Sequence, residues 1–525
     1  MASVASRPRA LPRIRSLPGG IAVPILLLLG LLGISLYLRT RALGASLWMD
    51  EGLSIGIASQ PLLHIPHVLR QDGSPPLYYM MLSVWMKAFG IGPARTQALS
   101  VAIALLAIPG ALWAGWSLFG RRAGYIAAAL AAVNPFLTAF AQETRMYSLM
   151  LLLSLLTTAA FLNLFVFGRR AYLPVFAVLL ALMLYTHNWG LFMAVGALCA
   201  LVPCWYATRD RRGLVRDALI GFGGAGVLYL PWVPTLLYQT RHTGAPWLTS
   251  PRFGAPIQIT RSLLGGGTPT AALLLAGGSG VAGVFAERGD RRERTALIAA
   301  TTLCVGTLAV AWTFSQFSPA WTTRYLGVAL GPILILAAAG LARAGVLGLA
   351  ALVIILGIWC IPKTYGLKNK SNAADLRAAA VPLLRPGDLV ISMQPEQTPL
   401  LEYHLERLGG ARGLRYATPM GPVVNPRVMD WRDAQPRLEH ATPAKELDPL
   451  LASLRRGERV LLVDPVTSQA NDWDAPWTQL VRRRSAQWGG AMAGNRCFRL
   501  VAAVPSFDRH ATRIGVRGTL YRKTC

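Results

Sequence analysis

The sequence predicts an α-helical polytopic membrane protein with about eleven transmembrane helices and a small C-terminal α/β domain outside the cytoplasm. Of its 525 residues, 53% are hydrophobic and only 14% are charged, whereas soluble proteins carry about a quarter charged residues. The apolar residues gather in blocks such as Ile21–Leu38 and Leu149–Phe167, close to the ~20 residues that cross a bilayer as a helix. The mean hydropathy of +0.42 also indicates a chain that is largely embedded in lipid.

Residues 21–362 form the predicted transmembrane domain. Its apolar segments are 21–38, 97–119, 124–141, 148–167, 171–186, 189–206, 217–238, 271–286, 295–314, 325–342 and 344–362. The segment 76–90 is apolar but short and contains Lys87, so we expect a helix that lies in the membrane interface. Residues 1–20 form a basic cytoplasmic tail, and the apolar segment after them is expected to be an uncleaved signal anchor.

The distribution of basic residues sets the expected orientation. With the N-terminus inside, the cytoplasmic segments hold 17 Lys and Arg and the outer segments hold 10, which agrees with the positive-inside rule. An odd number of spans then places residues 363–525 outside. The net charge of +28 follows this topology, and other basic residues in the C-terminal segment can face anionic lipid headgroups. The pattern therefore argues against nucleic acid as a partner.

The C-terminal segment has the pattern of a small α/β domain. Short apolar runs at Leu389–Met393, Val460–Val463 and Phe498–Val504 predict strands, and Ala373–Leu384 and Pro449–Leu454 predict helices. The segment contains no glycine-rich phosphate-binding motif.

The six cysteines show no metal-ligand spacing. Four lie in or beside apolar blocks, where a small buried thiol is the ordinary interpretation. Cys497 and Cys525 lie in the polar segment, and outside the cytoplasm such a pair can form a disulfide.

Acidic residues are rare in the membrane part and divide between its two sides. Residues 1–362 contain nine, of which five lie among the basic cytoplasmic loops, as solvated charges do. The other four are Asp50, Glu51, Asp72 and Glu143, all on the outer side in hydrophobic or aromatic sequence. Carboxylates at a membrane boundary are costly unless they are paired or used. The sequence therefore predicts chemistry on the outer side.

The first outer loop, about residues 39–96, carries two candidate motifs. In Trp48-Met49-Asp50-Glu51, one carboxylate can accept a proton from a hydroxyl that attacks a sugar, and the other can orient it or bind the acceptor. The alternative is an interfacial tryptophan beside two ordinary loop acids. In the second motif, Asp72-Gly-Ser-Pro-Pro-Leu-Tyr-Tyr, a structural turn explains most of the residues, and Asp72 is the one candidate for acceptor binding.

Polar groups also lie at three later outer junctions. Arg145 is suited to bind a phosphate through its planar guanidinium, and Glu143 can hold either that arginine or a sugar hydroxyl. A local Glu–Arg ion pair is the alternative. His187 is either a packing residue or a ligand. Arg324 can supply a second cation to a phosphate, or the Arg324-Tyr325 pair can anchor the chain at the interface.

These residues resemble the GT-C superfamily of membrane glycosyltransferases. The resemblance rests on Trp48–Glu51, Ser74–Tyr79, Gln142–Tyr147 and Arg324-Tyr325, which occur in the expected order, and it covers residues 1–362. The chain is most similar to bacterial proteins of the protein O-mannosyltransferase type and to the aminoarabinose transferase of lipid A. The resemblance implies a GT-C-like domain in the bacterial cytoplasmic (inner) membrane.

The resemblance also implies a reaction. The donor would be a polyprenyl-phosphate sugar, commonly mannose, and an inverting direct displacement would transfer the sugar to a hydroxyl. Asp50 would be the catalytic base, with Glu51 supporting it or binding the acceptor. The donor phosphate or sugar would be held by Glu143, Arg145, Tyr147, His187, Arg324 and Tyr325. Members of the superfamily differ in metal dependence, and with no ligand cluster in this sequence we expect no cofactor and no metal.

The acceptor stays open between a glycan, a protein and an exported metabolite. Two other classes of function are alternatives to the glycosyltransferase. A transporter or flippase of lipid-linked sugars would place charges near the middle of its spans or show internal repeats, whereas here the charges cluster at the outer ends. A cell-envelope assembly protein would have no need for the set of outer acids and arginines.

Overall fold

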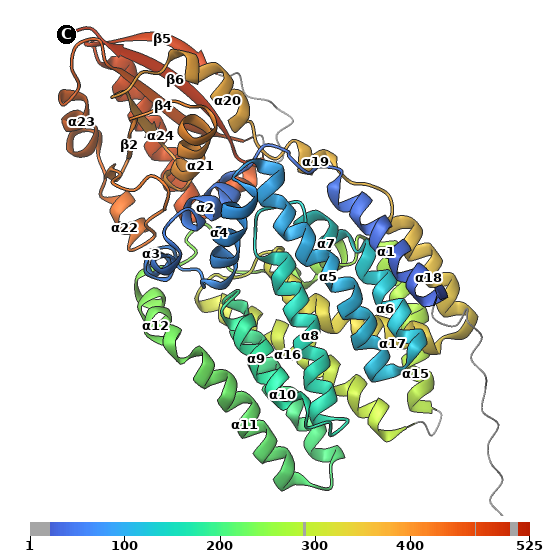
Figure 1. The fold of residues 1–525 in the computed structure, drawn as a ribbon. Helices are drawn as coiled ribbons and strands as arrows, with labels where there is room; N and C mark the ends of the chain where they lie inside the picture. Colours follow the sequence, from blue (N-terminus) through green and yellow to red (C-terminus); the bar gives the residue numbers. More distant parts are fainter. Residues whose placement is uncertain (1–21, 287–289, 468, 505–512) are drawn as a thin grey trace, which may run out of the picture.

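The computed structural model describes residues 22–286, 290–467, 469–504 and 513–525. A bundle of long helices makes up most of the chain, and a smaller domain built on one sheet lies at one end of the bundle (Figure 1). The predicted tail at residues 1–20 lies outside the described residues. The expected fold class, a polytopic helical protein with a small C-terminal α/β domain, is confirmed.

Helices follow one another along the membrane part. They are α1 (Ala22–Thr40), α2 (Met49–Ala58), α3 (Ile65–Asp72), α4 (Leu77–Phe89), α5 (Pro93–Phe119), α6 (Arg121–Val133), α7 (Pro135–Phe140), α8 (Tyr147–Phe165), α9 (Tyr172–Leu184), α10 (Trp189–Ala207), α11 (Arg211–Tyr229), α12 (Val233–His242), α13 (Gln258–Ser262), α14 (Gly267–Ala272), α15 (Gly278–Ala286), α16 (Arg291–Phe317), α17 (Leu330–Arg343), α18 (Gly345–Trp359) and α19 (Tyr365–Lys368). Short turns join several of them, including η3 (Leu230–Trp232), η5 (Leu273–Gly277) and η6 (Tyr325–Ala329).

Among the described residues, eight helical stretches are long and apolar enough to cross a membrane. The other predicted spans also fall on helices, but α9 and α18 are shorter. The predicted span over 124–141 is not one continuous helix, because α6 ends at Val133 and α7 begins at Pro135. Proline has no N–H with which to continue a helix. The Asn134 side chain caps the new helix by accepting a hydrogen bond from the Leu137 N–H at 3.1 Å.

The C-terminal domain is built on a six-stranded mixed sheet in the order β3-β2-β1-β4-β6-β5. Its strands are β1 (Leu389–Ser392), β2 (Arg415–Thr418), β3 (Gly421–Pro422), β4 (Arg459–Val466), β5 (Phe498–Val504) and β6 (Gly515–Lys523). Its α-helices are α20 (Ala373–Ala380), α21 (Thr398–Glu402), α22 (Ala434–Glu439), α23 (Asp448–Ala452) and α24 (Pro476–Gly494). Strand β1 is parallel to β2 and β4, and the other pairs are antiparallel. The three predicted strands are confirmed as β1, β4 and β5.

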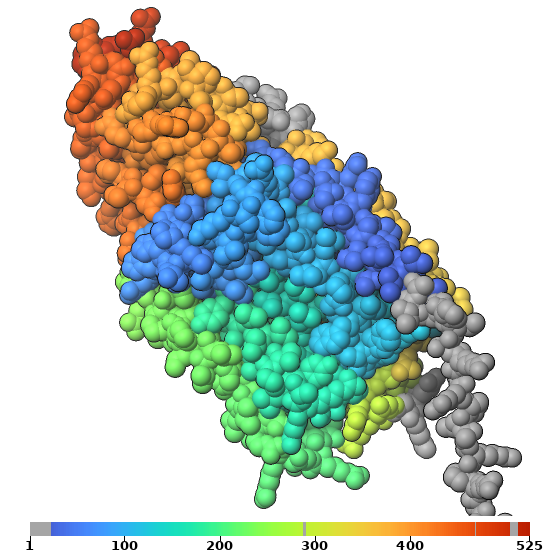
Figure 2. Space-filling view, viewed as in Figure 1, coloured from blue at the N-terminus to red at the C-terminus, as the bar shows by residue number. Residues whose placement is uncertain are grey.

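The first outer loop folds into α2, α3 and α4, which lie between the bundle and the C-terminal domain (Figure 1). Figure 2 shows these blue segments in continuous contact with the orange part of the C-terminal domain. On α2, a Cβ at Gly52 would lie 2.7 Å from Leu400 Cα, and one at Gly56 would overlap the Arg427 carbonyl oxygen. Residues four apart lie on one helix face. The two glycines therefore let the C-terminal domain pack directly on the backbone of α2.

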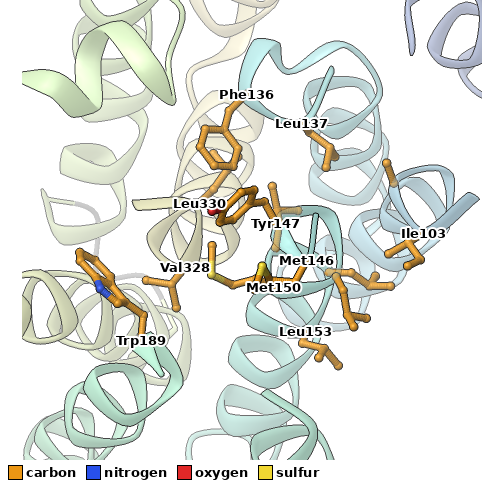
Figure 3. Close-up of a cluster of buried hydrophobic side chains, with 14 of the residues drawn as sticks. Ile103, Phe136, Leu137, Met146, Tyr147, Met150, Leu153, Trp189, Val328 and Leu330 are labelled. Atoms are coloured by element: carbon orange, nitrogen blue, oxygen red, sulfur yellow. The ribbon is translucent and has the colours of Figure 1, made fainter. Parts of the chain in front are cut away.

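A buried hydrophobic cluster holds neighbouring ends of several bundle helices together (Figure 3). Figure 3 shows Phe136 of α7, Tyr147 of α8, Trp189 of α10 and Val328 of η6 gathered in this cluster, and all four are buried. Close-packed side chains of this kind move little without a cost in free energy. The starts of α8 and η6 are thereby fixed, and a predicted site arginine lies one or two residues before each of them.

The C-terminal domain contains a disulfide between Cys497 and Cys525. The sequence had left this pairing open. The other four cysteines of the chain carry free thiols. The bond links the residue just before β5 to the end of the chain, so it constrains the edge of the sheet.

We expect maleimide to label four cysteines in denatured, unreduced protein and six after reduction, as counted by mass spectrometry. Because the bond joins residues 28 apart, Cys525→Ser should lower the stability of the domain by roughly 3 kcal/mol. Cys360→Ser is the control and should lower both counts by one. Six labels without reduction would show that the disulfide does not form in the native protein.

Candidate active site

A cavity of about 600 Å³ lies where the bundle meets the C-terminal domain. Five predicted site residues line it, namely Asp50, Asp72, Arg145, Arg324 and Tyr325. The C-terminal domain contributes Gln394, Glu396, Trp431, Asp472, Asp474 and Arg513. Distant parts of the sequence thus converge on a single cavity, as the one-sided placement of the motifs predicted.

Asp50 is the centre of the charged network in this cavity. It lies in the first turn of α2, where the helix dipole favours a negative charge. Its carboxylate accepts a hydrogen bond from Arg324 Nη1, and its Oδ2 lies 4.0 Å from Arg145 Nε. Arg145 also donates to the Asp50 carbonyl oxygen at 3.2 Å and to Ser54 Oγ at 3.1 Å. Two arginines from separate loops therefore surround one buried carboxylate.

Glu51 is directed away from the cavity and is completely buried. Its carboxylate forms an ion pair with Lys370 Nζ at 2.6 Å, and the two side chains are 0% and 1% exposed. It also accepts hydrogen bonds from the Thr144 N–H at 2.8 Å and from Gln97 Nε2 at 3.1 Å. Because Lys370 lies just before α20, this cluster ties α2 to the start of the C-terminal domain.

Tyr147, His187 and Tyr325 form an aromatic cluster beside the two arginines. The centre of the His187 ring lies 4.5 Å from that of Tyr325 and 6.3 Å from that of Tyr147. Burial and the two neighbouring guanidinium groups lower the pKa of His187 to about 3. The ring is therefore neutral at pH 7 and adds no positive charge to a phosphate site. Of the three residues, Tyr325 lines the cavity and the other two lie behind it.

Glu143 pairs with the C-terminal domain. Its Oε1 accepts a hydrogen bond from Arg513 Nη2 at 2.5 Å, and the Arg513 guanidinium lies 3.6 Å from the centre of the Trp48 ring. The alternative of a local pair between Glu143 and Arg145 is therefore wrong. These contacts join the connection between α7 and α8 to the C-terminal domain.

Asp72 ends α3 and reaches the same cavity. Burial raises its pKa above the ordinary value of an aspartate, while a hydrogen bond from Ser74 and the cation of Arg145 act in the opposite direction. The next residue, Gly73, has a left-handed φ of 96°, which glycine adopts without strain. The structure thus has both the turn and a carboxylate that faces the cavity.

A second, mainly apolar groove of about 290 Å³ adjoins the cavity. Phe140 and Thr323 line both spaces. The walls of the groove come mainly from α7 and from the end of α18, and they also include the cations Arg261 and Lys363. Apolar walls with interspersed cations provide an environment that suits an anionic lipid.

Comparison with solved structures defines the architecture. The chain aligns with ArnT from Cupriavidus metallidurans in the apo state at a TM-score of 0.59 and 14% identity, covering 95% of this chain and 98% of that chain. The chain has the GT-C fold. It also aligns with the same ArnT bound to undecaprenyl phosphate, at a TM-score of 0.57 and 14% identity over 96% of this chain and 98% of that chain.

A third structure shares the GT-C fold over a smaller part. The oligosaccharyltransferase of Archaeoglobus fulgidus, in complex with zinc and sulfate, aligns at a TM-score of 0.50 and 14% identity, covering 83% of this chain and 67% of that chain. Neither a scan against protein-family models nor a search of curated proteins gives a match. The similarity is therefore one of fold.

Several charged residues at this cavity were not found from the sequence. Glu396, Asp472, Asp474 and Arg513 lie in the polar C-terminal segment, where charged residues are ordinarily solvated. One signal was available, since Glu396 follows closely on a predicted strand and loops after strands commonly carry sites. Lys370 gave no such signal, because it ends a basic stretch just beyond the last span.

The metal prediction is not decided by the structure. Among the described residues, no group of three or more His, Cys, Asp or Glu side chains could hold a metal ion. In the cavity, Asp50 already has two arginines as counter-ions. Independence from metal therefore stays a prediction.

Proposed function

We propose that this protein is a glycosyltransferase that moves a sugar from a polyprenyl phosphate to a hydroxyl acceptor on the outer face of the bacterial cytoplasmic membrane. The observation that carries the proposal is the arrangement around Asp50, where one carboxylate and two guanidinium groups line a cavity next to an apolar groove. The GT-C fold supports it. Mannose is the sugar that we expect first.

The reaction needs one base and one cationic site. The acceptor oxygen attacks the anomeric carbon of the donor sugar. The bond between that carbon and the phosphate oxygen breaks, and the configuration of the carbon is inverted. The proton of the acceptor hydroxyl passes to the Asp50 carboxylate. The leaving group is the polyprenyl phosphate itself, which takes up the electron pair of the broken bond. No soluble nucleotide-binding domain is required by this chemistry.

Arg145 and Arg324 would stabilise the departing phosphate. Without a donor they are the counter-ions of Asp50. An arriving phosphate competes for the same guanidinium groups, because an anion with several oxygens pairs well with planar arginine. The competition would free Asp50 to accept a proton from the acceptor. Stabilisation of charge on the leaving group is commonly the largest contribution to the rate of such reactions.

The apolar groove would hold the lipid chain of the donor. It shares Phe140 and Thr323 with the cavity, so a lipid in the groove could present its phosphate near Arg324. ArnT has been crystallised with undecaprenyl phosphate, which makes that lipid the first to test. Glu51 would then act by holding α2, and through it Asp50, in position.

The test is transfer by the purified full chain in lipid nanodiscs. We expect radiolabel from polyprenyl-phosphate-mannose to enter an acceptor in added membranes, with release of one polyprenyl phosphate for each sugar transferred. Arabinose and aminoarabinose donors test the identity of the sugar. If none of the donors is consumed while labelled lipid crosses a vesicle bilayer, the protein is a flippase and the proposal is wrong.

Arg145→Ala should lower kcat/KM for the donor by about 10- to 100-fold, because a charge-assisted hydrogen bond is worth roughly 1.5–3 kcal/mol. Initial rates at varied donor concentration measure this effect. Arg41→Ala is the control, since Arg41 is an exposed arginine in a different connection, between α1 and α2, and it should leave the rate unchanged. Equal losses in both variants would indicate a general effect of surface charge.

A further inference from the structure

Carboxylates and tryptophans that the proposed reaction does not use also line the cavity. We define the acidic-aromatic wall as Glu396, Asp472, Asp474, Trp247 and Trp431, all of which line it. The first three belong to the C-terminal domain, together with Trp431, and Trp247 comes from the loop after α12. The cavity therefore has Arg145 and Arg324 beside Asp50 and Asp72 on the membrane domain, and an acidic, aromatic part that is mainly supplied by the C-terminal domain, which also contributes Arg513.

The topology of the sheet places the three acids together. Strands β1 and β4 are neighbours and parallel, so their carboxyl ends lie at the same edge of the sheet. Glu396 lies in the turn η8 (Pro395–Gln397) after β1, and Asp472 lies in η11 (Ala470–Trp473) after β4. The crevice beyond the carboxyl ends of parallel strands is where α/β domains bind ligands. Here that crevice opens onto the cavity that contains Asp50.

Glu396 has an oxygen that lacks a partner. The residue is only 3% exposed. Its Oε1 accepts hydrogen bonds from Gln394 Nε2 at 2.7 Å and from Trp477 Nε1 at 2.9 Å, whereas Oε2 has no hydrogen-bond partner from another described residue. A buried carboxylate oxygen without a donor costs free energy. A ligand that donates a hydrogen bond in the cavity would remove this cost.

The tryptophans form a cluster of mutually tilted rings next to this carboxylate. The centre of the Trp431 ring lies 4.4 Å from that of Trp247 and 5.2 Å from that of Trp477. Trp477 in turn donates to Glu396, so the tryptophan cluster and the carboxylate hold one another in place. Trp247 is half-buried and lines the cavity, where it offers a rigid apolar surface.

We infer that the acidic-aromatic wall is the acceptor site and that the acceptor is a neutral glycan; this inference rests on the proposed glycosyltransferase function. Carboxylates are acceptor-only groups when ionised, and sugar hydroxyls are a dense set of donors. The flat face of an indole matches the C–H face of a sugar ring. Negative charge on this wall disfavours an anionic acceptor, and it leaves the phosphate of the donor to Arg145 and Arg324.

A peptide acceptor fits this wall less well. One common way in which proteins bind an extended peptide is to add it as a strand to an exposed sheet edge. The edge strands of this sheet, β3 and β5, contribute none of the described residues that line the cavity. The chemistry of the wall consists of side-chain carboxylates and indoles, which recognise hydroxyls and rings.

The test uses the full chain in nanodiscs on an array of neutral mannose-, arabinose-, glucose- and galactose-containing oligosaccharides. We expect wild-type protein to bind at least one class, and the best ligand to quench tryptophan fluorescence in a titration. Glu396→Gln should raise its Kd by about 10- to 100-fold, because a hydrogen bond to a charged group is lost. Asp474→Asn, at an exposed position that tolerates the change, should raise Kd by about threefold.

Glu402→Gln is the matched control. Glu402, like Glu396, is buried and has a carboxylate oxygen without a hydrogen-bond partner among the described residues, but it does not line the cavity. The Glu402→Gln variant should therefore bind the oligosaccharide with the Kd of wild type. The inference is overturned if wild type binds no oligosaccharide, or if Glu396→Gln and Asp474→Asn both bind like wild type. In the transfer assay, radiolabelled sugar that appears on a Ser/Thr-rich peptide and on no oligosaccharide would also overturn the inference. The proposed glycosyltransferase function would then still hold. Thermal stabilisation by undecaprenyl phosphate measures binding of the donor lipid separately from the acceptor, and it should be equal in wild type and in Glu396→Gln.

Discussion

Asp50→Asn is expected to fold and insert normally and to lower the rate of sugar transfer by roughly 10²–10⁴-fold, the usual cost of a missing general base. Asparagine has nearly the same shape, and its side-chain oxygen can still accept a hydrogen bond from Arg324. The amide cannot take a proton from the acceptor, however. The effect should therefore appear in kcat, while binding of undecaprenyl phosphate, measured by thermal shift, is retained or improved because one competing anion has been removed.

The control for this variant is Asp210→Asn. Asp210 is exposed at the start of α11, where its side chain accepts a hydrogen bond from the Gly213 N–H at 2.8 Å. Asparagine caps helices about as well as aspartate, so transfer should be unchanged. Turnover by Asp50→Asn at the wild-type rate would remove Asp50 from the mechanism. Asp72 would then be the next candidate base, because its carboxylate faces the same cavity.

Lys370→Met should cause a large loss of stability at the junction between the bundle and the C-terminal domain. The substitution leaves the fully buried Glu51 without its counter-ion, and breaking a buried ion pair from one side costs about 3–5 kcal/mol. We expect a value near 3 kcal/mol, because Thr144 and Gln97 continue to donate hydrogen bonds to the carboxylate. Thermal unfolding in detergent, followed by near-UV circular dichroism, measures the change. Limited proteolysis should show the C-terminal domain released first.

Two further variants distinguish the effect of breaking the Glu51–Lys370 ion pair from the effect of removing a lysine. Lys368→Met changes an exposed lysine in the same connection and should leave the unfolding temperature unchanged. The double variant Glu51→Gln with Lys370→Met removes both charges and should recover most of the stability, since no buried charge is left unpaired. If Lys370→Met unfolds at the wild-type temperature, the ion pair does not hold the two domains together.

The ion pair also connects the domain interface to the proposed chemistry. Glu51 is the neighbour of Asp50 on α2, and the same helix packs against the C-terminal domain through Gly52 and Gly56. Any shift of the C-terminal domain would therefore move the proposed base. This is the physical reason to expect that the domain contributes to catalysis as well as to recognition of the acceptor.

The alternatives to a glycosyltransferase place their charges elsewhere. A transporter of lipid-linked sugars needs polar groups along a path through the bilayer. The network around Asp50 instead lies at the junction with the C-terminal domain, in loops and in the first turn of α2. A protein that only assembles the envelope would gain nothing from two arginines that surround a buried carboxylate, since such an arrangement is costly to build.

The sequence pattern predicted helices and strands where the length and hydrophobicity of a single segment are enough to identify the element. Length and hydrophobicity located the apolar helices, and alternating short apolar runs located β1, β4 and β5. Strand β6 was missed, because Gly515–Lys523 carries several charged residues and reads as polar. The break between α6 and α7 was missed although Pro135 marks it, since an apolar run on both sides of the proline resembled a single span.

The sequence by itself located Asp50, Asp72, Arg145 and Arg324, which line the cavity, because an acid or a cation beside membrane-spanning sequence is costly and so stands out. Tyr325 was located as the neighbour of Arg324. Only the tertiary structure decided which partner each has. Glu51 pairs with Lys370, which is 319 positions away, and Glu143 pairs with Arg513, which is 370 positions away. In the same way, the carboxylates of the acidic-aromatic wall come together because β1 and β4 pair as parallel neighbours. Charged residues of a polar domain look alike in sequence, and their burial depends on the surface against which the domain packs.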